Sequence, residues 1–428
     1  VVDDVIASGF QSAGQRCSAL RVLFLQEEIA DDIIEMLIGA MQELTIGDPA
    51  YLTTDIGPVI DQKALSNLQA HAKDMQQQAS LLYECEIAKN NGTFFAPKLY
   101  LIDDIAVLKR EVFGPCVHIV KFKAENIEQT MQQINGTGFG LTMGIHTRIE
   151  KRALELIQLS RAGNVYVNRN MIGAIVGVQP FGGKGLSGTG PKAGGPHYLP
   201  RLMLEKATPR LVLARDSETD KALASDHASR QQASQIMQDA IKCEDDWRLS
   251  ELNTRVSTVR QLLASIATVD IVDDFAEDLN STLAAARSQL ISIEARLKKP
   301  TLLPGPTGES NVLYLESRGI LVCFADKDVN FEYWTLSIVT ALATGNVVIS
   351  VVSELFYAEA IEFRQQFIAT GAPAGVFQIA KLQHLEALLS EEKLAGVVID
   401  SKSARSTYIM KKLAERSGAI LPVITAEY

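Results

Sequence analysis

Short apolar runs separated by helical stretches constrain the fold of the C-terminal part of this chain more than any other feature. The runs cover residues 319–324, 346–352, 375–379 and 396–399, and they are rich in β-branched side chains. Strands covered on both faces of a parallel sheet are apolar throughout, and such strands are joined by crossover helices. The pattern therefore predicts successive βαβ units, and with them an α/β fold.

The first 200 residues also alternate helical and strand-like stretches. Apolar residues recur at the helical period over 28–44. Strand-like runs at 117–122 and 164–167 flank a helical stretch at 150–160. This alternation predicts α/β layering here as well. Most glycine clusters of the chain lie in this region, so we expect its functional loops here.

A helix-rich segment separates these two regions. From about residue 215 to residue 297 the sequence contains no Gly or Pro, and helical periods recur. Pro and Gly residues at 300–306 then mark a turn into strand-like residues at 311–316. A separate coiled coil would need a sustained heptad with charged flanks, which this segment lacks. We therefore expect three parts, which are residues 1–207, 208–310 and 311–428.

Composition places the chain among folded globular proteins and disfavours a nucleic-acid partner. Of the 428 residues, 47% are hydrophobic and 21% are charged, which is enough apolar material for a large core. The net charge of −10 repels the phosphates of a nucleic acid. The sequence has no apolar run of membrane-spanning length and no basic leader followed by an apolar stretch. We therefore expect a cytoplasmic protein without a membrane span.

The cysteines and histidines show no spacing that is typical of a metal site. The five cysteines are widely spaced, with no Cys-x-x-Cys and no nearby pair of histidines. An odd number of scattered thiols indicates a reducing compartment. The six histidines are scattered too, so we expect them to be structural, and we predict no metal.

Cys17 is the candidate nucleophile. It lies in the string Gln-Ser-Ala-Gly-Gln-Arg-Cys-Ser at residues 11–18. A cysteine attacks as a thiolate, which nearby positive charge favours, and Arg16 with the small residues around it fits that need. A free cysteine is more often a small buried side chain. Whether Cys17 is a nucleophile is therefore judged from the whole string around it. Its pattern, Gln-x-x-Gly-Gln-x-Cys, resembles the nucleophile motif of the aldehyde dehydrogenase superfamily.

Further motifs of that superfamily follow in order. Residues 47–60 resemble the loop that follows the nucleophile, and residues 111–115 resemble the Glu-x-Phe-Gly-Pro cofactor motif. The segments 135–141, 163–168 and 180–183 complete the set. Several ordered motifs are far more specific than any single one. The resemblance implies an aldehyde dehydrogenase catalytic domain in the first part of the chain.

Two longer stretches, at 12–21 and 181–198, resemble the glutamate-semialdehyde (pyrroline-5-carboxylate) dehydrogenase module of the proline utilization A family. This resemblance implies NAD-dependent oxidation of L-glutamate γ-semialdehyde to glutamate, the second step of proline catabolism. Cys17 would attack the aldehyde to give a thiohemiacetal. Hydride would pass to NAD, and water would hydrolyse the thioester that remains.

The resemblance assigns further site residues. Glu111 would accept hydrogen bonds from ribose hydroxyls of the cofactor, and Phe113 would pack on a flat ring. Without the family, a surface carboxylate and a core Phe would be the preferred interpretation of these two residues. Amides in a glycine-rich turn form an anion-binding nest, although such turns are also common as simple flexible loops. The substrate carboxylate would be bound by four residues, Ser18, Ser187, Gly188 and Thr189.

Residues 183–188 also match Gly-x-Gly-x-x-Gly, the pattern of a dinucleotide-binding turn. That turn has to follow a strand and open a helix whose N-terminus holds the pyrophosphate. Here Pro180 and Phe181 precede the run, and Gly190-Pro191 follows it and disfavours a helix. We therefore predict no nucleotide site in this run.

The resemblance also implies what this chain lacks. A complete aldehyde dehydrogenase has its nucleotide-binding half before the nucleophile, with the oxyanion Asn and the Glu that activates water, whereas sixteen residues precede Cys17 here. We therefore expect the chain to be the C-terminal piece of a longer protein, and to be inactive alone. The parent protein would also carry a proline dehydrogenase domain that binds FAD.

The C-terminal part resembles that missing half in the order of its segments at 318–330, 341–354 and 371–376. The resemblance implies a Rossmann-like domain with leading helices. Val351, however, stands where the family has a Lys that contacts ribose, and Asp400 would repel a pyrophosphate. We therefore expect that this domain has lost its nucleotide chemistry.

On this interpretation residues 208–428 are a non-catalytic lid or assembly module of a homo-oligomer. Glu427 lies near the place of the family's general base, and we expect that it is not catalytic. The parent would be a bacterial cytoplasmic enzyme able to associate peripherally with a membrane. In one alternative the whole chain is a structural or oligomerisation module in which Cys17 is a relic. In another the second domain supplies its own nucleotide site, which Val351 and Asp400 disfavour.

Overall fold

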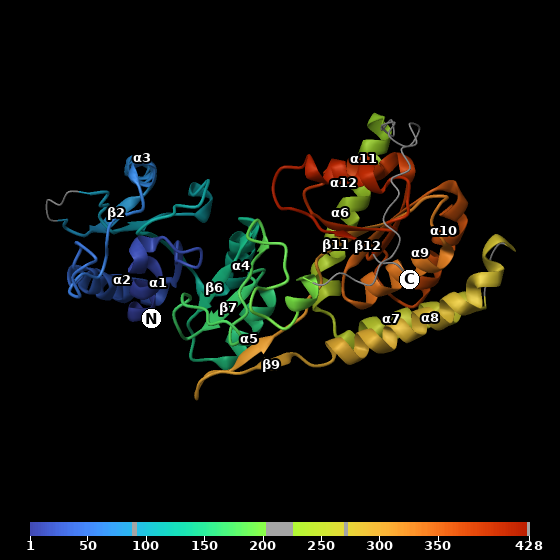
Figure 1. Ribbon diagram of the computed structural model, residues 1–428, viewed down its shortest axis with the longest axis horizontal. Coiled ribbons are helices and arrows are strands. Elements are labelled where there is room, and N and C mark those ends of the chain that lie inside the picture. Colours follow the sequence, from blue (N-terminus) through green and yellow to red (C-terminus); the bar gives the residue numbers. More distant parts are fainter. Residues whose placement is uncertain (88–91, 203–225, 269–272, 426–428) are drawn as a thin grey trace. The chain divides into compact units, whose positions relative to one another are not determined.

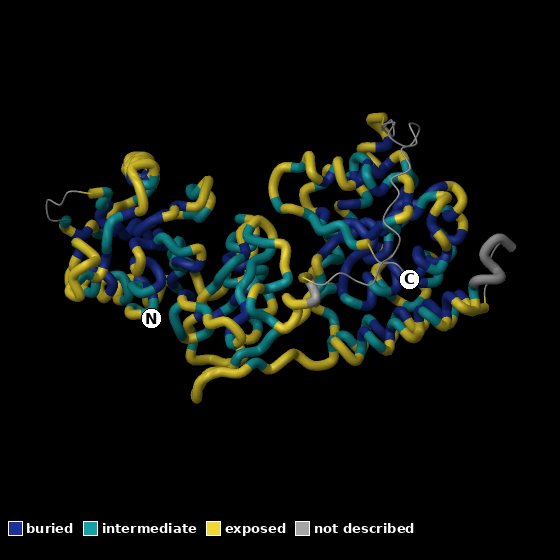
Figure 2. Tube along the Cα trace, viewed as in Figure 1, coloured by how far each residue is buried: buried dark blue, intermediate teal, exposed yellow. Residues whose placement is uncertain are grey.

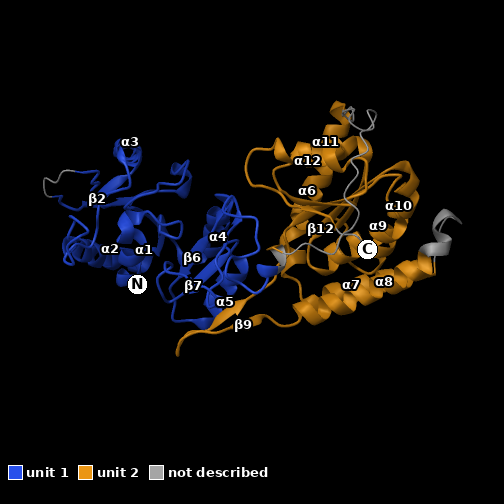
Figure 3. Cartoon of the chain, in the orientation of Figure 1, with its two compact units in different colours: residues 1–200 blue, residues 201–428 orange. Residues whose placement is uncertain are grey.

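A computed structural model describes residues 1–87, 92–202, 226–268 and 273–425 and, except at 200, 201 and 273–278, their side chains (Figure 1). The chain divides into two units, residues 1–200 and 201–428 (Figure 3). Each unit has a core of its own, formed by buried apolar side chains (Figure 2). The boundary predicted between residues 207 and 208 lies outside the described residues.

A four-stranded sheet forms the first half of unit 1. Its order is β1-β4-β3-β2, with β1 and β3 parallel to β4 and with β2 antiparallel to β3. The strands are β1 (Val22–Gln26), β2 (Ser80–Glu84), β3 (Lys98–Leu101) and β4 (Cys116–Phe122). Strand β4 is buried from Cys116 to Val120, as expected for an apolar run with a neighbour on each side. The strand predicted at 117–122 is thus confirmed.

Helices cover both faces of this sheet. α1 (Val2–Phe10) lies against the face that carries Val117, because a Cβ at Gly9 would lie 2.6 Å from a methyl carbon of Val117. α3 (Gln62–Gln78) covers the other face, where its His71 meets His118, since neighbouring residues of a strand point to opposite faces. α2 (Glu27–Gln42) packs beside α1, and the helix predicted at 28–44 is confirmed.

The second half of unit 1 has a small core built around Met131, Ile145 and Leu156. It contains the parallel strands β6 (Thr142–Ile145) and β7 (Asn164–Val167) and the helices α4 (Ile127–Gly136) and α5 (Glu150–Leu159). The strand predicted at 164–167 and the helix predicted at 150–160 are therefore confirmed. Unit 1 also has the short 3₁₀ turns η1 (Gln11–Gly14), η2 (Ile105–Val107) and η3 (Ala124–Asn126), and η4 (Leu199–Leu202) crosses the boundary to unit 2.

The glycine-rich run at 183–188 forms a strand and a turn. β8 (Lys184–Gly185) pairs antiparallel with β5 (Phe139–Gly140). Turns and bends follow β8, and the next helical element is the 3₁₀ turn η4. The run therefore opens no helix, as the sequence predicted.

Unit 2 is built on a five-stranded parallel sheet. Its order is β13-β12-β11-β14-β15, so the chain moves outward in one direction from β11 and then in the other. This is the order of a doubly wound, Rossmann-like sheet. The four predicted strands are confirmed, and β11 and β12 are buried along their whole length. The strands are β11 (Ile320–Ala325), β12 (Val347–Val352), β13 (Phe377–Lys381), β14 (Leu394–Ile399) and β15 (Val423–Ile424).

Helices cover both faces of this sheet as well (Figure 1). One group packs together around α9, which is buried on nearly every side: α7 (Leu252–Ile266), α8 (Asp273–Leu297), α9 (Phe331–Ala343) and α10 (Glu354–Ala369). A second group packs around α11: α6 (His227–Leu249), the turn η5 (Leu382–His384), α11 (Leu385–Ser390) and α12 (Ser406–Ala414). The predicted helix-rich segment is therefore helical from residue 227, and its part before 226 lies outside the described residues. Within the described ranges, no helix combines the length and hydropathy needed to cross a bilayer.

The strand predicted at 311–316 is shorter than expected and does not join the main sheet. β10 (Asn311–Leu313) pairs antiparallel with β9 (Thr301–Leu303) in a hairpin. Pro304, Gly305 and Pro306 follow β9 directly and lie in the connection. These residues reverse the chain locally, so the run pairs with its immediate neighbour.

Candidate active site

The loop that carries Cys17 has an unusual backbone. Ser12, Ala13 and Gly14 have φ values of 54°, 52° and 63°, so three consecutive residues are left-handed. For a residue with a Cβ this conformation costs about 1–3 kcal/mol and persists only where neighbouring structure enforces it. The loop exposes the Cys17 side chain to solvent and buries Ser18, which is 6% exposed.

Gly14 presses this loop against the segment that carries Glu111 and Phe113. A Cβ at Gly14 would lie 2.5 Å from the carbonyl carbon of Gly114 and 2.9 Å from the carbonyl oxygen of Gly9. Both positions are too close for any side chain, so only glycine fits. The nucleophile motif and the Glu-x-Phe-Gly-Pro motif are therefore in direct contact.

Arg21 connects the same two segments. Its Nη1 donates to the carbonyl oxygen of Gly14 at 2.5 Å, and its Nη2 donates to that of Arg16 at 3.0 Å. Oε1 of Glu111 accepts from Nε at 3.2 Å and from Nη2 at 3.1 Å. The guanidinium also lies 4.8 Å from the centre of the Phe113 ring. Burial lowers the pKa of Arg21 and the Glu111 charge opposes that shift, so the guanidinium stays charged.

The structure therefore brings Cys17, Ser18, Glu111 and Phe113 into one region. Both Arg21 bonds go to Oε1 of Glu111, and no hydrogen bond to its Oε2 is found among the described residues. Phe113 is 44% exposed. An accessible carboxylate oxygen beside an accessible ring can receive a ribose and a flat ring of a nucleotide. Arg16, in contrast, turns back to donate to Oγ of Ser12 at 3.0 Å.

The predicted carboxylate-binding loop lies elsewhere in unit 1. Oγ of Ser187 accepts from the backbone N–H of Gly140 at 3.0 Å. A Cβ at Gly188 would lie 2.8 Å from the carbonyl oxygen of Gly183, so the turn closes tightly on itself. Thr189 is exposed. Within the described part of the chain, no hydrogen bond links this loop to Cys17 or Ser18. No such contact therefore joins Ser18 to the other three residues predicted to bind the substrate carboxylate.

Two buried histidines, His71 and His118, contact each other next to the backbone of Arg21. No pattern in the sequence indicated that these two residues pair. Nδ1 of His118 lies 3.0 Å from the carbonyl oxygen of Arg21, and its Nε2 lies 2.9 Å from Nε2 of His71. The carbonyl can only accept, so Nδ1 of neutral His118 carries the proton and its Nε2 accepts from His71. Burial lowers the pKa of His118 to about 4 and also lowers that of His71. Tyr100 stacks on His118 with ring centres 5.5 Å apart.

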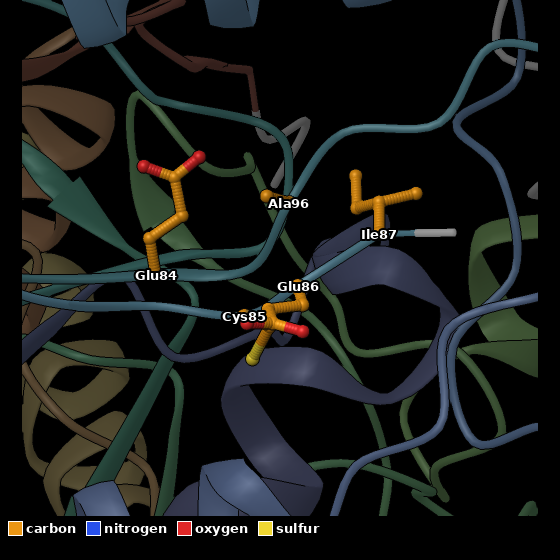
Figure 4. A pocket seen from close by; sticks show the side chains of 5 residues that line it. All are labelled: Glu84, Cys85, Glu86, Ile87 and Ala96. Carbon is orange, nitrogen blue, oxygen red and sulfur yellow. The ribbon is translucent and has the colours of Figure 1, made fainter. Parts of the chain in front are cut away.

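The other cysteines are poor candidates for a nucleophile. Burial raises the pKa of Cys85 to about 11, and raises those of Cys116 and Cys323 to about 12. Cys85 lies in a hollow with Glu84, Glu86, Ile87 and Ala96 (Figure 4). None of the predicted site residues lines this hollow. Nowhere in the described ranges do three His, Cys, Asp or Glu side chains form a group that could hold a metal ion.

In unit 2, two aspartates occupy the position at which a doubly wound sheet usually binds its ligand. That place is the carboxyl end of the strands where the strand order reverses, between β11 and β14. Asp326 there pairs with Arg405 at 2.9 Å, and both side chains are more than four-fifths buried. Asp328 accepts from the backbone N–H of Ala404 at 2.6 Å.

Of the two departures found in the sequence, one lies in this sheet and the other directly follows one of its strands. Val351 is fully buried in β12, and Asp400 directly follows β14. Asp400 accepts from the backbone N–H of Lys402 at 2.8 Å. Glu427 lies outside the described residues.

The chain matches known proteins over its whole length. Residues 1–208 match the model of the aldehyde dehydrogenase family, so this part of the chain is an aldehyde dehydrogenase region. Over 433 residues, 99% of the chain, it is 37% identical to the bifunctional protein PutA of Escherichia coli K12, and it covers 29% of that protein. The region is therefore PutA-like, and the resemblance inferred from the motifs is confirmed.

Two further relatives match about half of this chain. The 1-pyrroline-5-carboxylate dehydrogenase of Bacillus cereus (strain B4264) is 34% identical over 206 residues, which are 48% of this chain and 40% of that one. The crystal structure of a mutant of Bradyrhizobium japonicum proline utilization A superposes with a TM-score of 0.46 and 52% identity. That match covers 47% of this chain and 20% of the other. Similarity to PutA thus extends beyond residue 208, where the family model ends.

Proposed function

We propose that this chain supplies the nucleophile-bearing part of an enzyme that oxidises L-glutamate γ-semialdehyde to glutamate with NAD. The observation that carries the proposal is the placement of Cys17. Its side chain is exposed on a loop that directly contacts the Glu111–Phe113 segment, within a region of the aldehyde dehydrogenase family. The substrate is inferred from the similarity to the B. cereus dehydrogenase and to PutA.

Cys17 performs the chemistry that this chain contributes. Its Sγ forms a bond to the carbonyl carbon of the aldehyde, and the oxygen takes up a proton, which gives a thiohemiacetal. Glu111 and Phe113 would hold NAD, which would supply the acceptor for the hydride of that carbon while the hydroxyl oxygen gives up its proton. The thioester on Cys17 then reacts with water, which releases glutamate and restores the thiol.

Glu111 and Phe113 are the residues proposed to hold the cofactor. Oε2 of Glu111 would accept from ribose hydroxyls, while Oε1 stays with Arg21. Ser18, Ser187, Gly188 and Thr189 are proposed to hold the substrate carboxylate. Ser18 is buried, whereas Thr189 is exposed. Ser187 accepts from Gly140 while keeping its own O–H proton free to donate. Ser187 and the amide turn at 188–189 are therefore the stronger part of that proposal.

Unit 2 is proposed to act as a non-catalytic lid or assembly module in a bacterial homo-oligomer. The support is the carboxyl end of β11 and β14, where Asp326 and Asp328 hold Arg405 and the Ala404 amide. A pyrophosphate would have to displace these carboxylates and would meet their charge. Because unit 2 is proposed to offer no site for the pyrophosphate of NAD, the chain is proposed to form no NADH alone.

Selective chemistry at Cys17 tests the proposal. Iodoacetamide should label Cys17 faster than the partly exposed Cys243, and pyrroline-5-carboxylate should slow labelling of Cys17 only. Acetaldehyde, which lacks the carboxylate, is the control ligand. Equal labelling of the two cysteines, without protection, would instead favour a structural module in which Cys17 is a relic.

Turnover is measured separately with NAD and pyrroline-5-carboxylate, beside a Cys17→Ala control. We expect no NADH from either protein. NADH formation that depends on Cys17 would support the dehydrogenase but would refute the proposed loss of the nucleotide site in unit 2.

A further inference from the structure

We propose that Arg21 is the positioning residue of this site, which fixes the Cys17 loop and the Glu111 carboxylate in one geometry. The inference rests on the proposed function, because it concerns the same nucleophile and the same carboxylate. Arg21 touches neither substrate nor cofactor on this proposal, and it acts through the groups that it holds.

The Arg21 side chain holds several groups at once. Its guanidinium bonds the carbonyl oxygens of Gly14 and Arg16, which lie on either side of Gln15, and it also bonds Glu111. A planar fork of five N–H donors can hold several acceptors at fixed angles, whereas a lysine ammonium cannot. The Phe113 ring adds a contact with the guanidinium.

The loop that Arg21 holds has a strained backbone. Ser12 and Ala13 are left-handed although both carry a Cβ, and such residues relax unless something holds them. Arg21 bonds the carbonyl groups on the C-terminal side of this turn. Releasing them would let the turn relax and move Cys17.

Arg21 is itself fixed at its backbone. Its carbonyl oxygen accepts from the backbone N–H of His118 and from Nδ1 of His118, each at 3.0 Å. Nε2 of His118 in turn accepts from buried His71. The next residue, Val22, begins strand β1. Both ends of Arg21 are therefore held, which makes it a rigid bridge between the sheet and the loop.

The test compares Arg21→Lys and Arg21→Met with Arg148→Met, a control at an exposed arginine of the same unit. Hydrogen exchange is followed at the amides of Gln15 and Ala19, which bond the carbonyl oxygens of Ser12 and Arg16. Alkylation of each cysteine by iodoacetamide is followed by peptide mass spectrometry. Neither readout needs NAD or turnover, so a failure of the proposed reaction leaves this test intact.

Both Arg21 variants should speed exchange at the two amides by at least about tenfold, since bonds from a charged donor are lost. Arg21→Met should also slow alkylation of Cys17 severalfold, because it removes a nearby positive charge. Arg21→Lys keeps that charge and should retain most of the alkylation rate. Cys85 and Cys116, which are buried in the same unit, should stay unlabelled in both variants.

Two outcomes would overturn the proposal. If exchange at Gln15 and Ala19 matches the Arg148→Met control, Arg21 does not hold the loop. If Cys85 and Cys116 become labelled together with Cys17, the arginine stabilises the whole unit and has no special role at the nucleophile.

Discussion

Gly14→Ala is the substitution whose effect the structure determines most directly. The new methyl group would lie 2.5 Å from the carbonyl carbon of Gly114 and 2.9 Å from the oxygen of Gly9. Both neighbours are backbone atoms, so no side-chain rotation can relieve the clash. The residue also has a φ of +63°, which alanine adopts only with strain.

The two costs can be added. A left-handed alanine costs about 1–3 kcal/mol, and an extra carbon in a closely packed position costs about 1–3 kcal/mol. The free energy of unfolding of unit 1 should therefore fall by about 2–6 kcal/mol. With a slope of about 2 kcal/mol per molar urea, the unfolding midpoint should fall by about 1 M or more.

Cysteine accessibility can report the two units separately. Cys85 and Cys116 are buried in unit 1 and Cys323 is buried in unit 2. Pulse alkylation along a urea series should show an earlier midpoint for the first two thiols in Gly14→Ala, with the Cys323 midpoint unchanged. Both tryptophans, Trp247 and Trp334, lie in unit 2, so their fluorescence gives an independent check of that unit.

Gly39→Ala is the matched control. Gly39 lies inside helix α2, and a Cβ there would meet no atom within 4 Å. Gly39→Ala should therefore stabilise unit 1 by about 0.5–1 kcal/mol. The reasoning is refuted if Gly14→Ala lowers the unfolding free energy by less than about 1 kcal/mol, or if both variants shift the midpoint in the same direction.

Three further predictions concern stability. The pKa of His118 is about 4 in the folded chain, below the usual value of about 6.5. The unfolded chain therefore binds more protons between these values, and unit 1 should lose up to about 3 kcal/mol as the pH falls from 6.5 to 4; His118→Gln should flatten this dependence in urea melts. Asp328→Ala removes the acceptor of the Ala404 amide and should lower the Cys323 midpoint by the equivalent of about 1–2 kcal/mol. Asp61 caps helix α3 by accepting from Ala64 at 2.7 Å, so Asp61→Ala should cost unit 1 about 1 kcal/mol in the same labelling assay, without affecting Cys323.

Local patterns in the sequence predicted the secondary structure well. The β-branched runs of unit 2 became the strands of the parallel sheet, because burial on both faces leaves a visible apolar run. The run at 311–316 does not join the main sheet. Its hydrogen bonds are made instead with β9, which lies only a few residues earlier in the chain.

The site was only partly predictable. The string around Cys17 led to the proposed nucleophile, and the Glu-x-Phe-Gly-Pro motif led to the proposed cofactor residues, but neither pattern predicted that the two segments touch. Arg21, however, is 90 residues from Glu111, and His71 is 47 residues from His118. Such pairs depend on how strands and helices pack, which no local pattern encodes. The left-handed turn at Ser12 and Ala13 is likewise a tertiary effect, because neither residue type favours that conformation.

The contact between Gly14 and Gly114 has a consequence for recombining this chain with its relatives. Gly114 has the Gly14 loop next to it, and a Cβ at Gly114 would lie 2.5 Å from a methyl carbon of Leu68 in α3. Three segments that are distant along the chain therefore meet at one point, where neither glycine has room for a side chain. A chimera that takes residues 11–18 from one parent should take 111–115 and the Leu68 turn of α3 from the same parent. Crossover points placed between these segments should yield far fewer folded proteins than crossovers after residue 200, where the two units divide.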